Sequence, residues 1–468
     1  MLFPSREFLF YFLPILLAVY YLIPNRARRL WLAVGSYFFY GWWNPRYIPL
    51  LLVSTLLNYY AAMAIARLGD RPLRRTIYVA AIVANLGLLG FFKYFMFANR
   101  SLAELFGLVG ATYPESLLRI EVLLPIGISF FTFQAMSYTI DVYRGKVGTA
   151  AGLIDFACFK SLFPQLIAGP IVRYTDLADQ LRHPRFSWRR TYAGLTFFIL
   201  GLAKKVLLAD NISPLVNRFF DATDLAGFGA VDAITATIAY SLQIYFDFSG
   251  YSDMAVGLGY FLGYQFPQNF NSPYKSVDIS EFWRRWHMTL SYFLRDYLYI
   301  ALGGSRGGRW RTYRNLALTM LLGGLWHGAN WTFVVWGAWH GAWLVIERLA
   351  GKRYPLRHAP RVVRIGVTYG LACLGWIFFR AKDLSTALAV FGKLGDWRGG
   401  GILLTAAENR LPLLMSVLGL VLVFGLRNTW ELKQEAGVPR TLGLIALFLL
   451  CLVFLFGMVT HPFLYFQF

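Results

Sequence analysis

Charged residues are scarce in this sequence. Only 15% of the 468 residues are Asp, Glu, Lys or Arg, whereas 57% are hydrophobic and 18% are aromatic. A soluble chain carries about a quarter charged residues, and a soluble domain would be unable to hide this much apolar surface. Apolar stretches of membrane-spanning length recur from one end of the chain to the other. The composition therefore excludes a soluble globular protein and predicts a polytopic integral membrane protein.

Cysteines and the motifs of soluble enzymes are also lacking. The three cysteines, Cys158, Cys373 and Cys451, lie singly inside apolar runs, which argues against a disulfide framework or a zinc site. The sequence has no P-loop, no G-x-S-x-G elbow, no H-E-x-x-H and no convincing dinucleotide fingerprint. We therefore expect no metal and no bound cofactor, and hydrolysis by a serine triad or a zinc ion is poorly supported.

The basic residues are concentrated in alternate loops. The formal net charge is +21, but the loops between the basic ones are close to neutral, which is the positive-inside pattern of membrane proteins. We expect the basic loops in the cytoplasm, both termini on the outer side, and contact with membrane lipids rather than with nucleic acid. The basic loops are Arg26 to Arg29, Arg67 to Arg75, Arg144 to Lys146, Arg173 to Arg190, Lys275 to Arg314 and Arg348 to Arg364.

The apolar runs predict an all-α polytopic bundle with about 11 to 13 transmembrane or re-entrant helices. We treat 1–468 as one integral membrane domain, with a catalytic core at about 230–350 and a basic cytoplasmic or interfacial segment at 263–314. The first run lacks a cleavage site of the A-x-A kind, so we expect a retained anchor. The segment 152–172 contains two prolines, and we expect a re-entrant hairpin or a pair of half-helices there. The predicted spans are 8–24, 31–43, 47–66, 76–97, 120–143, 191–209, 230–263, 314–327, 330–348, 362–380, 410–426 and 441–460.

One histidine interrupts the apolar runs of the core. His327 lies in GGLWHGANW, between Leu316–Trp326 and Trp331–Ile346, which contain no charged residue. The run before it would extend about 16 Å as a helix, too short to cross a hydrocarbon core of about 30 Å, so His327 should lie inside the membrane region. With Asn330 and two tryptophans beside it, we expect a packed polar pocket. The alternative is a histidine that only satisfies a buried carbonyl, although intramembrane ionisable residues are functional candidates because burying them is costly.

A second histidine lies in a segment with helical spacing. In EFWRRWHMTLSYFLRDYLYI, Glu281 to Ile300, large apolar side chains recur every three or four positions. We expect an amphipathic helix at the cytoplasmic interface, with His287 pointing towards protein and Arg284 and Arg285 off the apolar stripe. The alternative is a membrane-surface anchor whose arginines bind lipid phosphates.

Two carboxylates lie on a long apolar helix predicted for YFDFSGYSDMAVGLGY. Asp247 and Asp253 are costly to bury without partners. We expect them to pair with Arg284, Arg285 or a tyrosine hydroxyl, a reading that we favour over direct catalysis, and we count them among the candidate pocket residues.

Two turns carry further basic candidates. Lys275 follows the turn-rich NFNSP, and Arg306 lies in GGSRGGR, which has the composition of a phosphate-cradling loop and equally of a flexible one. A cationic stretch would suit an anionic acyl donor. We therefore expect Arg284, Arg285 and Arg306 to affect the affinity for that donor more than the maximal rate. A neutral imidazole in a low-dielectric pocket suits acyl transfer, because it takes the proton from an attacking hydroxyl.

The longest motifs carry a resemblance to a known family. FWRRWHMTLSYFLRDYLYI followed by LLGGLWHGANWTFVVWGAWHG resembles the bacterial membrane-bound O-acyltransferase (MBOAT) family, and the nearest branch is that of the alginate O-acetyltransferase membrane subunit. MLFPSREFLFYFLP, LPIGISFFTFQAMSYTIDVYRG, FPQLIAGPIVRY and YFDFSGYSDMAVGLG are similar to that branch as well. The resemblance covers most of the chain and is weak from Lys382 onwards.

The resemblance implies a fold, a site and a reaction. The fold would be a multi-helix bundle with a pocket or tunnel, in which His327 matches the family's invariant catalytic histidine and His287 its second one. The reaction would pass an acyl group from a cytoplasmic thioester, acetyl-CoA or a carrier-protein thioester, across the bacterial inner membrane. A periplasmic acetyltransferase partner would then O-acetylate an exopolysaccharide of the alginate or cellulose type.

Three alternatives to this function stay open. Peptidoglycan O-acetylation uses similar membrane subunits. A proton-coupled transporter or flippase would use buried His and Asp as proton relays, but no repeated halves with matching broken helices are found. A subunit that only scaffolds a synthase would have little use for two histidines in aromatic, arginine-rich surroundings.

Overall fold

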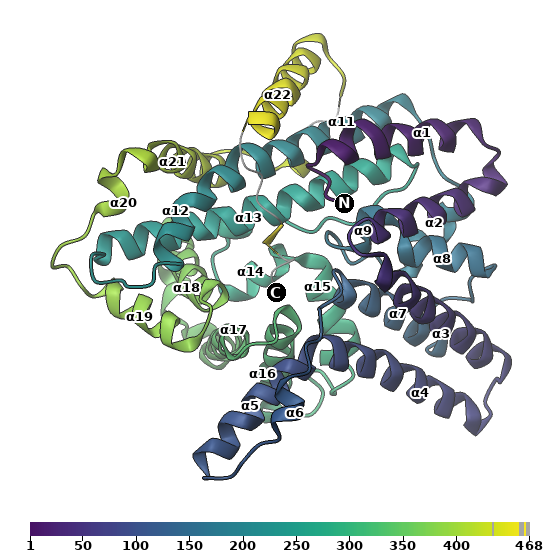
Figure 1. Cartoon of the computed structure of the whole chain (residues 1–468), viewed down its shortest axis with the longest axis horizontal. Coiled ribbons are helices and arrows are strands. Elements are labelled where there is room, and N and C mark those ends of the chain that lie inside the picture. Colours follow the sequence, from purple (N-terminus) through teal and green to yellow (C-terminus); the bar gives the residue numbers. More distant parts are fainter. Residues whose placement is uncertain (433–434, 458–462, 465–468) are drawn as a thin grey trace. The chain divides into compact units, whose positions relative to one another are not determined.

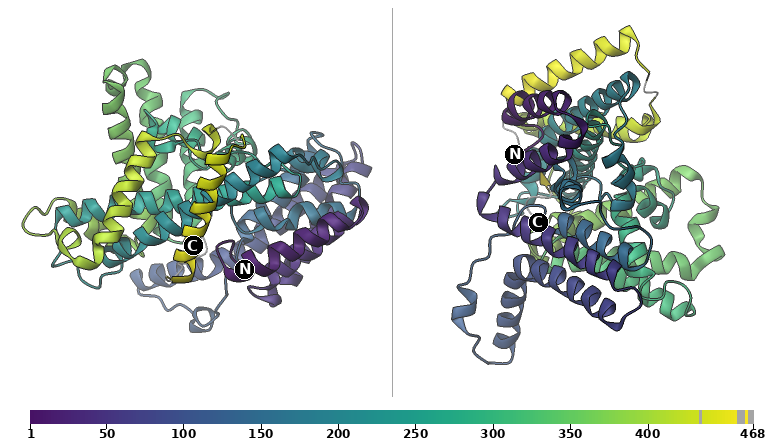
Figure 2. Two further views of the ribbon diagram at one scale, coloured as in Figure 1. Left: turned by 90° about the horizontal axis from the view of Figure 1, so that it is seen from above. Right: turned by 90° about the vertical axis from the view of Figure 1, so that its right-hand side faces the viewer.

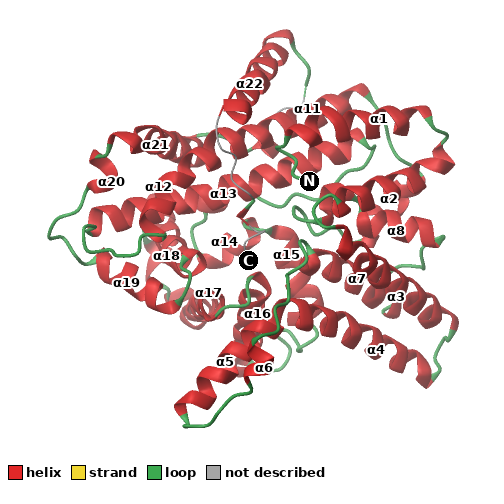
Figure 3. Ribbon diagram, viewed as in Figure 1, coloured by secondary structure: helices red, strands yellow, loops and turns green. Residues whose placement is uncertain are grey.

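The computed structural model describes residues 1–432, 435–457 and 463–464. Its regular elements are helices joined by loops and turns (Figure 3), so the predicted all-α class is confirmed. The chain divides into two compact units, one made of residues 1–190 and 258–267 and the other of residues 191–257 and 268–468.

The first unit holds the N-terminal helices, drawn in purple and blue (Figure 1). The predicted half-helices at 152–172 are present as two short helices, α8 and α9, separated at Leu162; their re-entry into a membrane stays a prediction. The elements of this unit are η1 (Phe8–Phe12), α1 (Leu13–Leu22), α2 (Asn25–Gly41), η2 (Pro45–Tyr47), α3 (Ile48–Arg67), α4 (Pro72–Leu89), η3 (Gly90–Tyr94), α5 (Phe95–Leu108), α6 (Glu115–Leu118), α7 (Ile128–Tyr143), α8 (Leu153–Ser161), α9 (Phe163–Leu166) and α10 (Tyr174–Arg182).

The second unit holds both candidate histidines. A single long helix, α13, follows the prediction for 230–263 closely, and the elements before it form one continuous helical run with a π-helical turn at η4. The elements are α11 (Trp188–Ala203), η4 (Lys204–Ala209), α12 (Asp210–Phe220), α13 (Ala230–Phe261), η5 (Pro273–Lys275), α14 (Ile279–Arg285), α15 (Met288–Phe293), η6 (Leu294–Tyr299), α16 (Arg309–His327), α17 (Trp331–Ala350), η7 (Gly351–Arg353), η8 (Pro355–His358), α18 (Arg361–Arg380), α19 (Leu384–Leu394), α20 (Ile402–Thr405), η9 (Ala407–Asn409), α21 (Arg410–Gly425), η10 (Thr429–Glu431) and α22 (Val438–Gly457).

Two glycines allow α16 and α17 to pack closely as a hairpin (Figures 1 and 2). A Cβ at Gly324 would collide with the carbonyl oxygen of Phe333, and one at Gly337 with that of Met320. Small residues at such crossings are a common device of membrane helices, because they let the backbones approach. The hairpin places His327, at the end of α16, beside the first turns of α17.

Six helical segments among the described residues are long and apolar enough to cross a membrane. The chain is therefore a multi-pass membrane protein. The predicted span 314–327 lies inside α16, whose first turns carry three arginines, and the predicted span 441–460 extends past Gly457 into residues outside the described part. The six segments are Pro45–Arg67, Pro72–Leu108, Trp188–Phe220, Arg361–Arg380, Ala407–Gly425 and Val438–Gly457.

Candidate active site

His327 is buried at the end of a long helix. It is the last residue of α16 and only 3% exposed. A helix of this length rises about 28 Å, which separates His327 from the basic start of α16. Its ring lies edge-on to Trp336 at 5.0 Å and to Phe379 at 5.4 Å between centroids. The imidazole therefore lies in an aromatic chamber, packed inside the protein as predicted but with aromatic walls where a polar pocket was expected.

The segment around His287 is not the continuous helix that its spacing predicted. The chain is extended at Trp286 and left-handed at His287, whose φ is 42°, so α14 ends and α15 begins there. The loop before α14 forms backbone hydrogen bonds on both sides of this break. Asn271 N–H donates to the Arg285 carbonyl, and Met288 N–H donates to the Asn269 carbonyl. A positive φ is uncommon for a residue other than glycine, and here it turns the imidazole into the protein, where it is fully buried.

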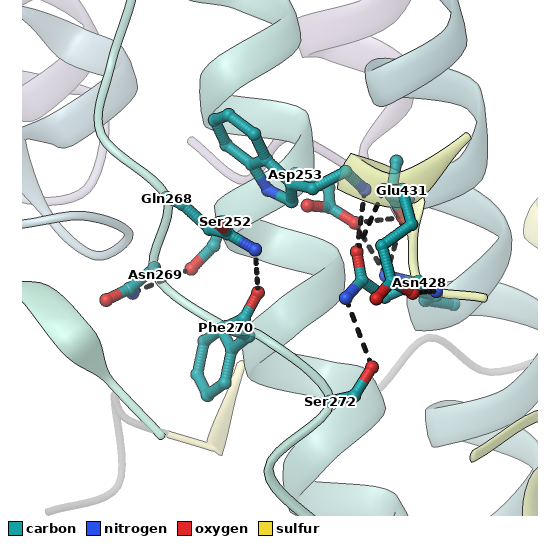
Figure 4. A network of polar contacts seen from close by, with 11 residues as sticks. Ser252, Asp253, Gln268, Asn269, Phe270, Ser272, Asn428 and Glu431 are labelled. Atoms are coloured by element: carbon teal, nitrogen blue, oxygen red, sulfur yellow. Dashed lines mark hydrogen bonds and ion pairs between the residues drawn. The ribbon is translucent and has the colours of Figure 1, made fainter. Parts of the chain in front are cut away.

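Asn269 fixes the tautomer of His287. Its side-chain oxygen Oδ1 lies 3.0 Å from His287 Nδ1 and also accepts from the Thr289 backbone N–H and hydroxyl, while its amide Nδ2 donates to Ser252 (Figure 4). A backbone N–H only donates, so the shared atom is the amide oxygen and His287 Nδ1 must carry the hydrogen. The lone pair of His287 is then on Nε2.

Burial keeps His287 neutral. The side chain is 0% exposed, and desolvation lowers the pKa of His287 to about 3. A charged imidazole is disfavoured in such surroundings. His287 is therefore a neutral hydrogen-bond acceptor at Nε2 near pH 7.

The two histidines come together although forty positions separate them. Their ring centroids are 6.4 Å apart, and Phe248 from α13 lies against His287 at 4.7 Å. Two neighbouring buried imidazoles in an aromatic chamber are suited to receiving and relaying a proton. Reaction with water is disfavoured there because the walls are apolar.

The two aspartates of α13 have different partners from those predicted. Asp247 pairs with Lys205 at 2.8 Å, and Asp253 pairs with Lys204 at 2.6 Å. The predicted pairing with Arg284, Arg285 or a tyrosine hydroxyl is wrong, because η4 brings two consecutive lysines against α13. These ion pairs compensate buried charge, and they favour a structural role for both aspartates.

Three of the predicted basic residues are engaged in local contacts. Lys275 donates to the Leu426 carbonyl at 2.5 Å. Arg285 pairs with Glu281 at 2.8 Å and donates to the Asn271 carbonyl. Arg284 is 65% exposed and lies 4.0 Å from Asp278, so of these three it is the most accessible to a ligand.

The remaining predicted residues lie in turns. Arg306 is exposed in the turn before α16. Asn330 begins α17: its side chain accepts from the Thr332 N–H at 3.1 Å and donates to the Lys382 carbonyl at 2.8 Å. Asn330 therefore holds the turn that follows His327.

Sequence reasoning missed Asn269, Trp336 and Phe379 as parts of this site. Asn269 lies in a turn-rich stretch, NFNSP, whose asparagines indicated only turns. Trp336 occupies a helical position where an aromatic residue usually means packing. No local signal links Phe379 to His327, because the contact crosses from α18 to α16.

Comparison with known proteins identifies the family of this chain. The model of MBOAT, the membrane-bound O-acyltransferase family, matches residues 43–380, a range that includes both histidines. A protein named "Probable alginate O-acetylase AlgI" from Pseudomonas aeruginosa is 46% identical over 455 residues, covering 94% of this chain and 84% of that protein. Its counterpart from Azotobacter vinelandii is 43% identical over 450 residues, covering 94% of this chain and 88% of that protein.

A second kind of relative matches along the full chain. The Peptidoglycan O-acetyltransferase of Helicobacter pylori is 36% identical over 525 residues, covering 100% of this chain and 98% of that protein. The resemblance to the alginate O-acetyltransferase branch is confirmed by the AlgI relatives. The chain belongs to the membrane-bound O-acyltransferase family and is an O-acyltransferase.

Proposed function

We propose that this enzyme takes acetyl groups from a cytoplasmic thioester, acetyl-CoA, and passes them across the bacterial inner membrane for O-acetylation of an exopolysaccharide. The basic loops face the cytoplasm in this proposal, and a periplasmic acetyltransferase partner delivers the group to the polymer. The observation that carries it is the pair of buried histidines, 6.4 Å apart between ring centroids, in the aromatic chamber of this membrane O-acyltransferase.

The chemistry assigns His327 the role of general base. An acceptor hydroxyl gives its proton to the His327 imidazole as its oxygen attacks the thioester carbonyl. The C–O ester bond forms and the C–S bond breaks, and the proton passes from the imidazolium to the departing thiolate. His287, held by Asn269 in the tautomer whose Nδ1 carries the hydrogen, orients the hydroxyl. The aromatic walls protect the thioester from water.

Two kinds of relative support two different candidate polymers. The relatives at 43% and 46% identity are named for alginate, and we take alginate as the first candidate and cellulose as a second exopolysaccharide. Peptidoglycan is the other candidate, supported by the match of the Helicobacter pylori enzyme over 100% of this chain.

The acceptor is tested with purified protein in nanodiscs and acetyl-CoA labelled in the acetyl group. Candidate periplasmic partners are supplied one at a time with alginate, cellulose or peptidoglycan fragments. Label in alginate or cellulose that depends on the enzyme supports the proposal. Label that appears only in peptidoglycan would refute an exopolysaccharide acceptor and identify peptidoglycan as the acceptor. A parallel reaction with an acetylated carrier protein tests the donor, because exclusive use of that donor would refute acetyl-CoA.

A further inference from the structure

A cationic cavity lies in the second unit, away from the aromatic chamber. It has a volume of about 300 Å³ and is bordered by the start of α14, the end of α17, the turn that follows and the start of α18. This size is at the lower end for small-molecule sites. The charged residues that line the cavity are Arg284, Arg348, Arg357, Arg364, Asp278 and Glu347.

The two carboxylates of the cavity are already engaged by the backbone. Glu347 accepts hydrogen bonds from the Ile279 N–H at 2.6 Å and from the Ser280 N–H and hydroxyl at 3.0 and 2.8 Å. Asp278 caps α14 by accepting from the Glu281 N–H at 2.6 Å. Acidic groups at a helix start are stabilised by its N–H groups, so these two carboxylates are held there and neutralise the arginines only in part.

The four arginines lack close counter-ions. Arg284 and Arg364 lie 4.0 and 3.9 Å from Asp278, at the outer limit of an ion pair, and their shared partner is engaged elsewhere. Arg348 and Arg357 form no ion pair with any carboxylate in the described part of the chain.

Arg364 also has an unsatisfied donor. Its Nε is buried and finds no hydrogen-bond partner among the described residues. A buried donor of a charged group without a partner is costly, and such a group indicates a ligand oxygen. Guanidinium groups bind phosphate through paired N–H donors better than other side chains do.

One face of α17 connects this cavity to the chamber of His327. Trp336, His340 and Leu344 recur every four residues and so lie along the same side of the helix. Leu344 lines the cavity, His340 is fully buried with its ring 5.0 Å from Trp336, and Trp336 lies 5.0 Å from His327. From Trp336 to Arg348 the helix rises about 18 Å.

We propose that the cavity formed by Arg284, Arg348, Arg357 and Arg364 binds a phosphate ester. Two kinds of ligand carry such a phosphate ester. One is the headgroup of an anionic phospholipid, because basic pockets between membrane helices recognise such headgroups. The other is the phosphate-bearing end of a nucleotide thioester donor whose acyl end lies along α17 near His327, and this source rests on the proposed function.

The test compares Arg357→Gln with the matched control Arg353→Gln. Arg357 lines the cavity and is exposed, so its replacement should leave the fold intact, whereas Arg353 is an exposed arginine of the same connection outside the lining. A second variant, Arg348→Gln together with Arg364→Gln, removes two more guanidinium groups. Loss of one charged hydrogen-bond partner weakens binding by about tenfold.

Binding is measured without turnover, so a failure of the proposed reaction does not affect the result. One arm titrates coenzyme A, 3′-dephospho-coenzyme A and pantetheine into protein in neutral-lipid nanodiscs. The other arm uses native mass spectrometry to count the phosphatidylglycerol molecules that stay bound to the protein. Loss of about tenfold for coenzyme A but not for pantetheine identifies the donor, and selective loss of phosphatidylglycerol identifies the lipid. If both cavity variants bind both probes as Arg353→Gln does, the proposal is overturned.

Discussion

Asn269 Oδ1 and His287 Nδ1 lie 3.0 Å apart, and the amide oxygen also accepts from the Thr289 N–H. Asn269 thus acts as a positioning residue that sets the tautomer of His287. A carboxylate at position 269 would instead favour the imidazolium, because an opposite charge raises the pKa of a histidine.

We expect Asn269→Asp to shift the acidic limb of the pH–rate profile towards higher pH, with kcat lowered more than KM is raised. Asn269→Ala, which removes the amide, should lower kcat by about tenfold or more. The nearby Gln268→Glu, whose side chain contacts the Phe270 carbonyl, is the matched control and should keep the wild-type profile. A profile of Asn269→Asp identical to that of Gln268→Glu would show that Asn269 does not act through His287.

The lowered pKa of His287 predicts a pH dependence of stability. The folded protein holds His287 neutral down to about pH 3, whereas the unfolded chain protonates a histidine near its ordinary pKa of about 6.5. Between these values the unfolded state binds the extra proton, so the free energy of unfolding falls as the pH is lowered. The slope is at most about 1.4 kcal/mol per pH unit for one such group.

This effect is measured as a difference in unfolding between wild type and His287→Gln at pH 4.5 to 7.5. The wild type should lose stability relative to the variant as the pH falls. His183→Gln, at an exposed position, should follow the wild type. Parallel curves for wild type and His287→Gln would contradict the neutral buried state.

The buried ion pairs of α13 predict a strong effect of one lysine. Lys205 contacts Asp210 at 2.7 Å and Asp247 at 2.8 Å with almost no exposure. Lys205→Met leaves two carboxylates buried without a cation, and breaking such a pair costs about 3–5 kcal/mol. We expect a large drop in the thermal midpoint of the detergent-solubilised protein. Adding Asp210→Asn and Asp247→Asn should restore much of it, and a Lys205→Met variant as stable as wild type would refute the assigned pairing.

The close approach of α16 and α17 predicts a steric effect at Gly337. Gly337→Ala places a Cβ against the carbonyl oxygen of Met320, so the hairpin must separate and His327 must move. Gly366→Ala on α18 is the matched control, because its Cβ meets nothing within 4 Å and alanine favours a helix by about 0.5–1 kcal/mol. Thermal unfolding should show Gly337→Ala destabilised and Gly366→Ala unchanged or stabilised. Equal midpoints for the two variants would contradict the packing.

The sequence predicted the helical class, the long helix at 230–263 and the burial of both histidines, because the lengths of the apolar runs and the local motifs carry that information. It did not predict the break at His287. The segment from Glu281 to Ile300 has regular helical spacing, and the break depends on backbone hydrogen bonds with the preceding loop, where Asn271 N–H donates and the Asn269 carbonyl accepts.

The partners of the aspartates were missed for a related reason. Lys204 lies forty-nine positions before Asp253 in the sequence, and only the packing of η4 against α13 brings them together. The sequence pattern suggested Arg284 and Arg285 as the partners of the aspartates because these arginines lie together in one amphipathic segment. Pairing between distant helices is set by tertiary structure, to which a single sequence gives no local signal.

Thioester consumption measures whether His327 is the general base of acyl transfer. Purified wild type and His327→Ala are compared in nanodiscs with acetyl-CoA and the acceptor system, after equal thermal midpoints have shown that both are folded. General-base catalysis contributes about 10²- to 10⁴-fold, so His327→Ala should consume the donor slower by that factor while still binding coenzyme A. Consumption by His327→Ala at the wild-type rate would show that His327 is not the general base.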